Sequence, residues 1–152
     1  MDKYVFMSYK SEEDEIARKI KDEFEKRDIK IWRAPESILP GKSYADSICD
    51  AISNSSCFLL LLSLKSQDSK WVIRELTRAD DENKDIYVLF LDDFKITNND
   101  ISLRINNNQT RNYFENKDDV LAELIETLNN KYSFSRSNKN IITDKYFSFG
   151  NR

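Results

Sequence analysis

The sequence contains no histidine and only two glycines, and these absences exclude most of the common catalytic designs. Without histidine there are no histidine-dependent triads or histidine general bases, and most zinc sites are ruled out. Gly41 and Gly150 alone cannot supply a GxGxxG or Walker loop for a phosphate. An enzyme of this composition works with carboxylates, hydroxyls, amines and aromatic faces, so we expect no metal site and no bound cofactor.

Three other features are scarce. The two cysteines, Cys49 and Cys57, fall in a predicted helix and a predicted strand, as expected for small core residues of a reduced protein. No apolar run approaches the roughly 18 residues that span a bilayer, and the first residues lead directly into a strand without a signal-peptide pattern. The net charge is -3, and no basic block is long enough to bind nucleic acid. We therefore expect a cytoplasmic protein that binds neither nucleic acid nor a membrane.

Predicted strands and helices alternate along the chain. Apolar runs predict strands at residues 3–8, 28–32, 57–63 and 86–91, with a short fifth strand at 112–115. Helical spacing of apolar residues predicts helices at 11–26, 45–52 and 120–128 and another within 66–83. Ser11 and Asp14 have the spacing of a capping box at the first helix. This series predicts an α/β fold, a flavodoxin-like five-stranded parallel sheet with helices on both faces.

The chain divides into one predicted domain and a tail. A length of 152 residues suits a single core, which we assign to residues 1–130. Both prolines and Gly41 lie within 33–42, which predicts a defined loop after the second strand. Residues 131–152 are polar with interspersed aromatic residues, and we interpret them as a linker or an oligomer contact.

Trp71 and Glu75 form the most informative pair in the sequence. They lie one helical turn apart, so their side chains share one face of the predicted helix. That helix follows the buried strand 57–63, and open α/β sheets bind ligands at the carboxyl ends of their strands. Taken alone, the pair is better explained by an indole that covers the core and a carboxylate in solvent.

Four segments, in order, resemble the motifs of one family. They are the strand end Tyr4-Val-Phe-Met-Ser-Tyr-Lys10, the loop from Ile31 to Tyr44 with its Ala-Pro and Pro-Gly steps, the strand Leu59-Leu-Leu-Leu-Ser63 and the helix Ser69-Lys-Trp-Val-Ile-Arg-Glu-Leu76. Residues 3–130 thereby resemble a Toll/interleukin-1 receptor (TIR) domain, in its bacterial NAD+-consuming form. The four segments also coincide with the predicted elements.

The resemblance implies a fold, an activity and a site. TIR domains have a five-stranded parallel sheet, and many cleave the nicotinamide–ribose bond of NAD+, whereas others act only by homotypic assembly. In the enzymatic members the essential residue is the glutamate that matches Glu75. NAD+ is then the substrate, and no separate cofactor is expected. The implied substrate-binding residues are Ser8, Tyr9, Lys10, Arg33, Gly41, Lys42, Tyr44, Ser63 and Trp71.

The residue types suit this chemistry. Nicotinamide leaves NAD+ as a neutral molecule from a cationic precursor, so the reaction needs no general acid, unlike ordinary glycoside hydrolysis. One desolvated carboxylate can stabilise the oxocarbenium-like centre, and Trp71 can stack on a planar ring. Lys10, Arg33 and Lys42 are candidate diphosphate partners, although Arg33 could instead pair with Glu36 in the loop.

Some assignments stay open at this point. Arg74 and Arg78 flank the Glu75 face and could hold its carboxylate ionised or form ion pairs along the helix. Gly41 is best explained by its backbone, because a Pro-Gly step favours a turn with positive φ. The product is ADP-ribose or a cyclic isomer, depending on whether water or a group of the same molecule is the acceptor.

Three functions compete. The first is an NAD+ glycohydrolase of bacterial antiviral defence that self-assembly activates, with a sensor or effector domain on the same or a partner chain. The second is a non-catalytic scaffold that acts by TIR–TIR contact. The third, a flavodoxin-like nucleotide or response-regulator domain, calls for an acidic cluster where this chain has Ser8, Tyr9 and Lys10.

Overall fold

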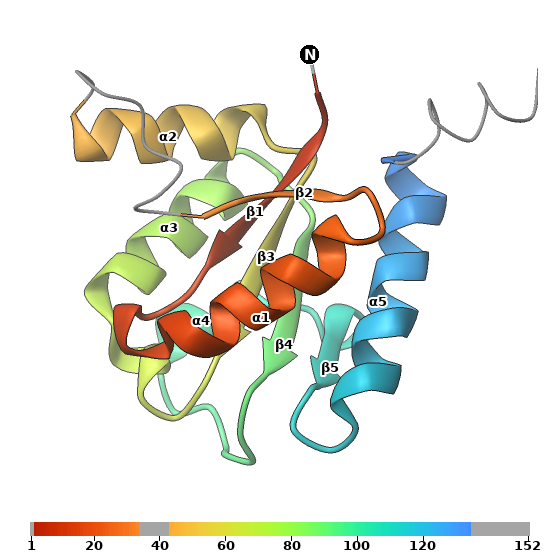
Figure 1. Cartoon of the computed structure of the whole chain (residues 1–152). Helices are drawn as coiled ribbons and strands as arrows, with labels where there is room; N and C mark the ends of the chain where they lie inside the picture. The colour runs from red at the N-terminus through yellow and green to blue at the C-terminus, as the bar shows by residue number, and fades with distance from the viewer. Residues whose placement is uncertain (1, 34–42, 135–152) are drawn as a thin grey trace, which may run out of the picture.

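The structure, a computed structural model, describes residues 2–33 and 43–134 and has a five-stranded sheet at its centre (Figure 1). The strands are β1 (Tyr4–Ser8), β2 (Lys30–Trp32), β3 (Cys57–Leu62), β4 (Ile86–Phe90) and β5 (Thr110–Asn112). They run in the order β2-β1-β3-β4-β5, and every pair is parallel. The predicted α/β fold with a parallel five-stranded sheet is confirmed.

Helices cover both faces of the sheet (Figure 1). They are α1 (Asp14–Glu25), α2 (Tyr44–Asn54), α3 (Lys70–Asp81), the single-turn α4 (Asn99–Ser102) and α5 (Lys117–Tyr132). Short 3-10 turns lie at Ser11–Glu13, Ser66–Asp68 and Asn107–Gln109. One core packs α1 and α5 on the sheet, and the other packs α2 and α3 on the opposite face. The central strand β3 is buried along its whole length, which explains its unbroken apolar sequence.

Alternation along β1 decides which face each of its residues reaches. Val5 and Met7 belong to the core under α1 and α5, whereas Phe6 belongs to the core under α2 and α3. Because successive side chains of a strand point to opposite faces, Ser8 faces the α3 side. Tyr9, the next residue, packs against the α1 core. The end of β1 therefore serves both faces of the sheet.

The scarcity of glycine shows at the helix ends. Asp28 follows α1 with φ 63° and Asn83 follows α3 with φ 58°, positions that glycine fills in most proteins. Asp and Asn tolerate this left-handed conformation better than other residues that carry a Cβ. After α1, Ile29 N donates to Phe24 O and Asp28 N donates to Glu25 O, which closes the helix with a Schellman-type arrangement.

Two local predictions are wrong. The fifth strand begins at Thr110 and ends at Asn112, so it begins two residues and ends three residues earlier than predicted, and Tyr113 is a buried core residue. The Ser11 capping box does not form, because the Ser11 hydroxyl donates to Glu12 Oε1 within a 3-10 turn that precedes α1. The three polar residues of β5 form an edge strand that no apolar pattern signals.

The boundary between domain and tail also differs in detail. Helix α5 continues to Tyr132, and both Tyr132 and Phe134 pack against the α1 and α5 core. Two residues of the predicted tail, 131 and 132, therefore still belong to α5. Residues 135–152 lie outside the described part of the chain, and so does most of the predicted loop, including Gly41 and Lys42. Within the described residues, no helix has the length and apolar character to cross a membrane.

Candidate functional site at the carboxyl ends of the strands

Glu75 is a buried carboxylate in the second turn of α3. Its side chain is 9% exposed, and the Ser8 hydroxyl donates a hydrogen bond of 2.6 Å to its Oε1. Across residues 2–33 and 43–134 no other hydrogen bond reaches this carboxylate. The end of β1 and helix α3 are thus joined by a buried polar contact on the sheet face that α2 and α3 cover.

Burial changes the acidity of Glu75. Loss of hydration raises the pKa of Glu75 from 4.5 to about 7, and the hydrogen bond from Ser8 opposes this rise. Neither Arg74 nor Arg78 contributes to the shift, so these arginines do not hold the carboxylate ionised. A carboxyl group that titrates near neutral pH is typical of functional sites, because small changes in its surroundings switch its charge.

An exposed aromatic pair lies beside Glu75. The rings of Tyr44 and Trp71 are 5.2 Å apart between centroids and inclined by 69°, an edge-to-face contact. Burial and the charge of Glu75 both raise the pKa of Tyr44, so the phenol lies within electrostatic range of the carboxylate. Tyr44 is 46% exposed and Trp71 44% exposed, a high value for large aromatic residues. Both side chains are therefore partly open to a ligand, and the Arg74 guanidinium lies over the Trp71 ring, 5.5 Å from its centroid.

Helix caps fix where these aromatic residues lie. Ser43 caps α2 by accepting a hydrogen bond from Asp46 N, and Ser69 caps α3 by accepting from Val72 N. Tyr44 and Trp71 therefore occupy the first turns of their helices. Both helices begin at the carboxyl edge of the sheet, where the predicted ligand site lies.

Tyr9 and Arg33 form a separate cluster with Asp14. The Arg33 guanidinium is 3% exposed, pairs with Asp14 Oδ1 and donates to the Tyr9 hydroxyl at 2.9 Å. Tyr9 packs on the α1 core, the face of the sheet opposite to Glu75. The structure thus does not bring Tyr9 and Arg33 to the Glu75 carboxylate. Tyr9 points to the α1 face of the sheet because side chains alternate along β1. Arg33, which directly follows β2, reaches Asp14 because α1 lies beside β2.

Lys10 and Ser63 lie near this edge but have other partners. Lys10 forms an ion pair of 3.4 Å with Glu12. Ser63 is buried and exchanges hydrogen bonds with Ser66, because Ser63 N donates to Ser66 Oγ at 2.7 Å and Ser66 N donates to Ser63 Oγ at 3.1 Å. Burial raises the pKa of Glu13, and a hydrogen bond from Ser63 opposes this rise. Ser63 therefore shapes the turn that leads into α3.

The profile of the TIR domain family matches residues 5–128, which is most of the chain. The chain belongs to the TIR domain family. The match begins in β1 and ends in α5, so it includes both elements that hold the Ser8–Glu75 contact. A comparison with curated protein sequences finds no significant match.

Solved structures confirm the TIR fold. A metazoan TIR-STING receptor from C. gigas aligns with a TM-score of 0.59 at 25% identity, over 78% of this chain and 38% of the receptor. The chain thus spans well under half of that receptor. The TIR domain of the Toll-related receptor TRR-2 from Hydra magnipapillata aligns with a TM-score of 0.55 at 20% identity, over 60% of this chain and 73% of that chain. The TIR domains of the activated Roq1 resistosome align with a TM-score of 0.58 at 17% identity, over 94% of this chain and 99% of that chain.

The roles of two residues of this TIR domain were not predicted from the sequence. Asp14 holds Arg33 in place, and an acid in the first turn of α1 was the available signal. Gln67 is buried, and its Oε1 accepts from Thr97 N at 3.0 Å and from Asn98 N at 3.2 Å. Gln67 thereby joins the segment after β4 to the turn before α3, and no pattern in the sequence marks it.

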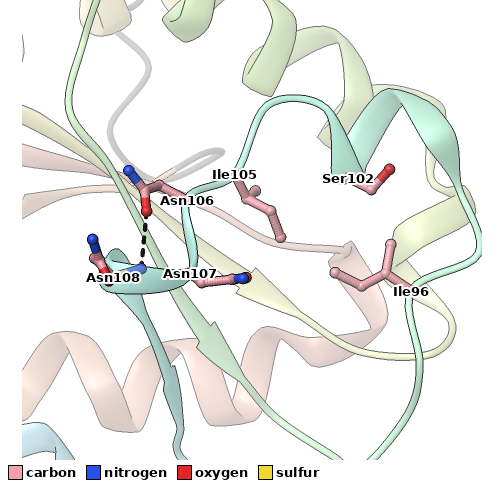
Figure 2. Close-up of a pocket in the computed structure, with 6 residues that line it drawn as sticks. All are labelled: Ile96, Ser102, Ile105, Asn106, Asn107 and Asn108. Carbon is pink, nitrogen blue, oxygen red and sulfur yellow. Dashed lines mark hydrogen bonds between the residues drawn. The ribbon is translucent and has the colours of Figure 1, made fainter.

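A hollow of about 600 Å³ lies apart from the Glu75 group, between α4 and the turn before β5 (Figure 2). Six residues line it: Ile96, Ser102, Ile105, Asn106, Asn107 and Asn108. Figure 2 shows the Asn106 side chain turned to the Asn108 backbone, where its Oδ1 accepts a hydrogen bond of 2.9 Å. The hollow contains none of the predicted site residues of this TIR domain and no ionisable lining residue.

Proposed function

We propose that this TIR domain cleaves the nicotinamide–ribose bond of NAD+, with Glu75 as the catalytic residue. The observation that carries the proposal is a buried carboxylate, held by Ser8, beside the exposed aromatic pair Tyr44 and Trp71. Family resemblance supports the same residue, since Glu75 matches the essential glutamate of the enzymatic members. Ser8, Trp71 and Tyr44 are the substrate-binding residues that lie with it.

The reaction needs little from the protein. The bond between ribose C1′ and the pyridinium nitrogen breaks, and its electron pair leaves with nicotinamide, which becomes neutral. The ribose is left as an oxocarbenium-like cation, to which the ionised carboxylate of Glu75 offers negative charge and acceptors for the ribose hydroxyls. Water then bonds to C1′ and loses a proton to give ADP-ribose, or a group of the same molecule bonds there and gives a cyclic isomer.

The acidity of Glu75 fits this role. A pKa of about 7 leaves the carboxyl group partly protonated at neutral pH when the site is empty. A bound pyridinium cation favours the ionised form, because an opposite charge nearby lowers the pKa of a carboxyl group. The substrate thus helps to create the charge that its own cleavage requires.

The aromatic pair provides the recognition of a planar ring. Trp71 and Tyr44 present faces on which nicotinamide or adenine can stack, and a pyridinium adds a cation–π attraction on the order of 1 kcal/mol. NAD+ would be the substrate, and the proposal invokes no further cofactor.

Self-assembly is part of the proposal. Enzymatic members of the family often become active when neighbouring domains complete each other's sites, and the resemblance to bacterial members implies a role in antiviral defence. We place this protein in that setting, with weak activity when dilute. A sensor or effector domain, on the same or a partner chain, would supply the trigger.

The test follows nicotinamide release from NAD+ at rising protein concentration and with a crowding agent. We expect release per protein molecule to increase with concentration, and chromatography against ADP-ribose and cyclic standards to identify the second product. If the protein self-associates and leaves NAD+ unaltered, it is instead a non-catalytic TIR scaffold. Equal release from the Glu75→Gln variant would remove Glu75 from the catalytic role.

A further inference from the structure

Two of the three cations that the sequence nominated for the substrate diphosphate have acidic partners in the structure, and the third, Lys42, lies outside the described residues. Arg33 is buried against Asp14, and Lys10 pairs with Glu12. A guanidinium that is 3% exposed and already bonded to a carboxylate costs much to redirect toward a ligand. Arg33 is thereby held away from a diphosphate contact, and the described residues beside Glu75 include a further cation, Arg74.

Arg74 is exposed and lies directly beside the aromatic pair. Its guanidinium carbon is 5.5 Å from the centroid of the Trp71 ring. In the described part of the chain, Arg74 has no hydrogen bond and no ion pair. Arg78, one turn further along α3, pairs with Glu82. It is therefore a suitable control for Arg74.

Helix geometry joins Arg74 to the catalytic group. Trp71, Arg74 and Glu75 are spaced i, i+3 and i+4, so they share one face of α3. Glu75 is buried on the sheet side of this face, whereas Arg74 is exposed. A ligand whose ribose contacts Glu75 and whose ring stacks on Trp71 brings its phosphates within the range of the long, exposed Arg74 side chain.

We propose that Arg74 binds the diphosphate of the substrate. It thereby makes the site selective for a pyridine dinucleotide over the corresponding nucleoside, nicotinamide riboside, which has no phosphate. The inference rests on the proposed function. A planar guanidinium suits bidentate contact with phosphate oxygens, which a lysine ammonium cannot reproduce. When Arg74 turns to the phosphates it leaves the Trp71 ring, and that face becomes free for stacking.

The test measures binding to the full chain with Glu75→Gln, so that no ligand is consumed. The probes are NAD+, ADP-ribose and nicotinamide riboside, which has the same ribosyl pyridinium but no phosphate. Arg74→Ala should weaken binding of NAD+ and ADP-ribose about 10-fold or more and should not weaken binding of nicotinamide riboside. Arg74→Lys should restore part of the loss, and Arg78→Ala should have no effect.

Several results overturn the inference. One is an equal loss of affinity for nicotinamide riboside in Arg74→Ala, which would mean that Arg74 acts only through Trp71. The others are an unchanged affinity for ADP-ribose in Arg74→Ala and no binding of ADP-ribose at all. Failure of the proposed function looks different. If the unmodified protein releases no nicotinamide while ADP-ribose binding depends on Arg74, the diphosphate contact stands and catalysis does not. If nicotinamide is released and Arg74→Ala leaves the KM for NAD+ unchanged, catalysis stands and this contact does not.

Discussion

The Ser8 hydroxyl donates a hydrogen bond of 2.6 Å to Glu75 Oε1 and joins the end of β1 to the second turn of α3. This contact crosses 67 positions of sequence and connects two of the family motifs. It also opposes the effect of burial on the Glu75 carboxyl group. Burial sets the main direction of the Glu75 pKa, and the Ser8 hydroxyl both opposes that shift and joins β1 to α3.

Replacing Ser8 by Ala should move the pH dependence of activity. Without the hydrogen bond, the pKa of Glu75 rises further, by about 0.7 if the bond is worth about 1 kcal/mol. The pH at which kcat/KM for nicotinamide release reaches half its maximum should rise accordingly. Ser47→Ala is the control, because the Ser47 hydroxyl is buried in α2 and has no partner among the described residues. An unchanged profile in Ser8→Ala would contradict the assignment.

Replacing Glu75 by Gln should stabilise the protein at alkaline pH. The folded state holds the pKa of Glu75 at about 7, above the value of about 4.5 in an unfolded chain, so folding favours the protonated form. The stability of the unmodified protein is then greatest below pH 4.5 with respect to this group and falls as the pH rises toward 7. A permanently neutral Gln avoids this loss, which reaches roughly 3 kcal/mol by pH 8.

Urea unfolding of both proteins at pH 4 and pH 8 measures the difference. We expect nearly equal free energies of unfolding at pH 4 and a more stable Glu75→Gln variant at pH 8. A variant that is less stable at pH 8 would show that the ionised carboxylate contributes to folding. The result also matters for catalysis, because a stabilised inactive variant has lost its chemistry and not its fold.

Replacing Trp71 by Ala should separate binding from folding. Trp71 is 44% exposed, so its loss should cost little stability, whereas loss of ring stacking should weaken NAD+ binding by about 1–3 kcal/mol. Trp32, the other tryptophan, stacks on Phe6 with 5.1 Å between the ring centroids, and its replacement is the control for loss of an indole outside the site. In a Trp32→Phe variant, quenching of the remaining indole fluorescence by NAD+ would report on Trp71 alone. Retained affinity in Trp71→Ala would remove Trp71 from the site.

Replacing Arg33 by Ala should lower stability more than it lowers the affinity of the folded protein for NAD+. Arg33 is 3% exposed and bonded to Asp14 and Tyr9, so its removal should cost about 2 kcal/mol of unfolding free energy. Arg18 also pairs with Asp14, at 2.8 Å, but is 63% exposed, and Arg18→Ala should cost less than about 1 kcal/mol. Thermal unfolding compares the two variants. Equal stability with a large loss of NAD+ affinity in Arg33→Ala would restore Arg33 as a ligand residue.

The order of strands and helices was predictable because each buried element has a periodic or unbroken apolar pattern. Strand β3 is buried along its whole length, and α1 buries Ala17, Ile20 and Phe24 on one stripe. Strand β5 has no such pattern, since its three residues are polar and lie at the edge of the sheet. Its position depends on pairing with β4, which the local sequence does not encode.

The site was predictable only in part, because neighbours in sequence separate onto opposite faces of a strand. Ser8 reaches Glu75, and Tyr9 lies on the other side with Arg33. The period of two along β1 contains this information, but the family motif groups both residues together. The role of Arg74 beside Trp71 needed the helix to be placed, since a basic residue on an exposed helix has many possible partners.

The most direct test compares nicotinamide release from NAD+ by the unmodified protein and by Glu75→Gln, at equal and high protein concentration, after urea unfolding has shown that both are folded. We expect release by the unmodified protein and none above background by the variant. Equal release by the two proteins would contradict the central claim that Glu75 is the catalytic carboxylate.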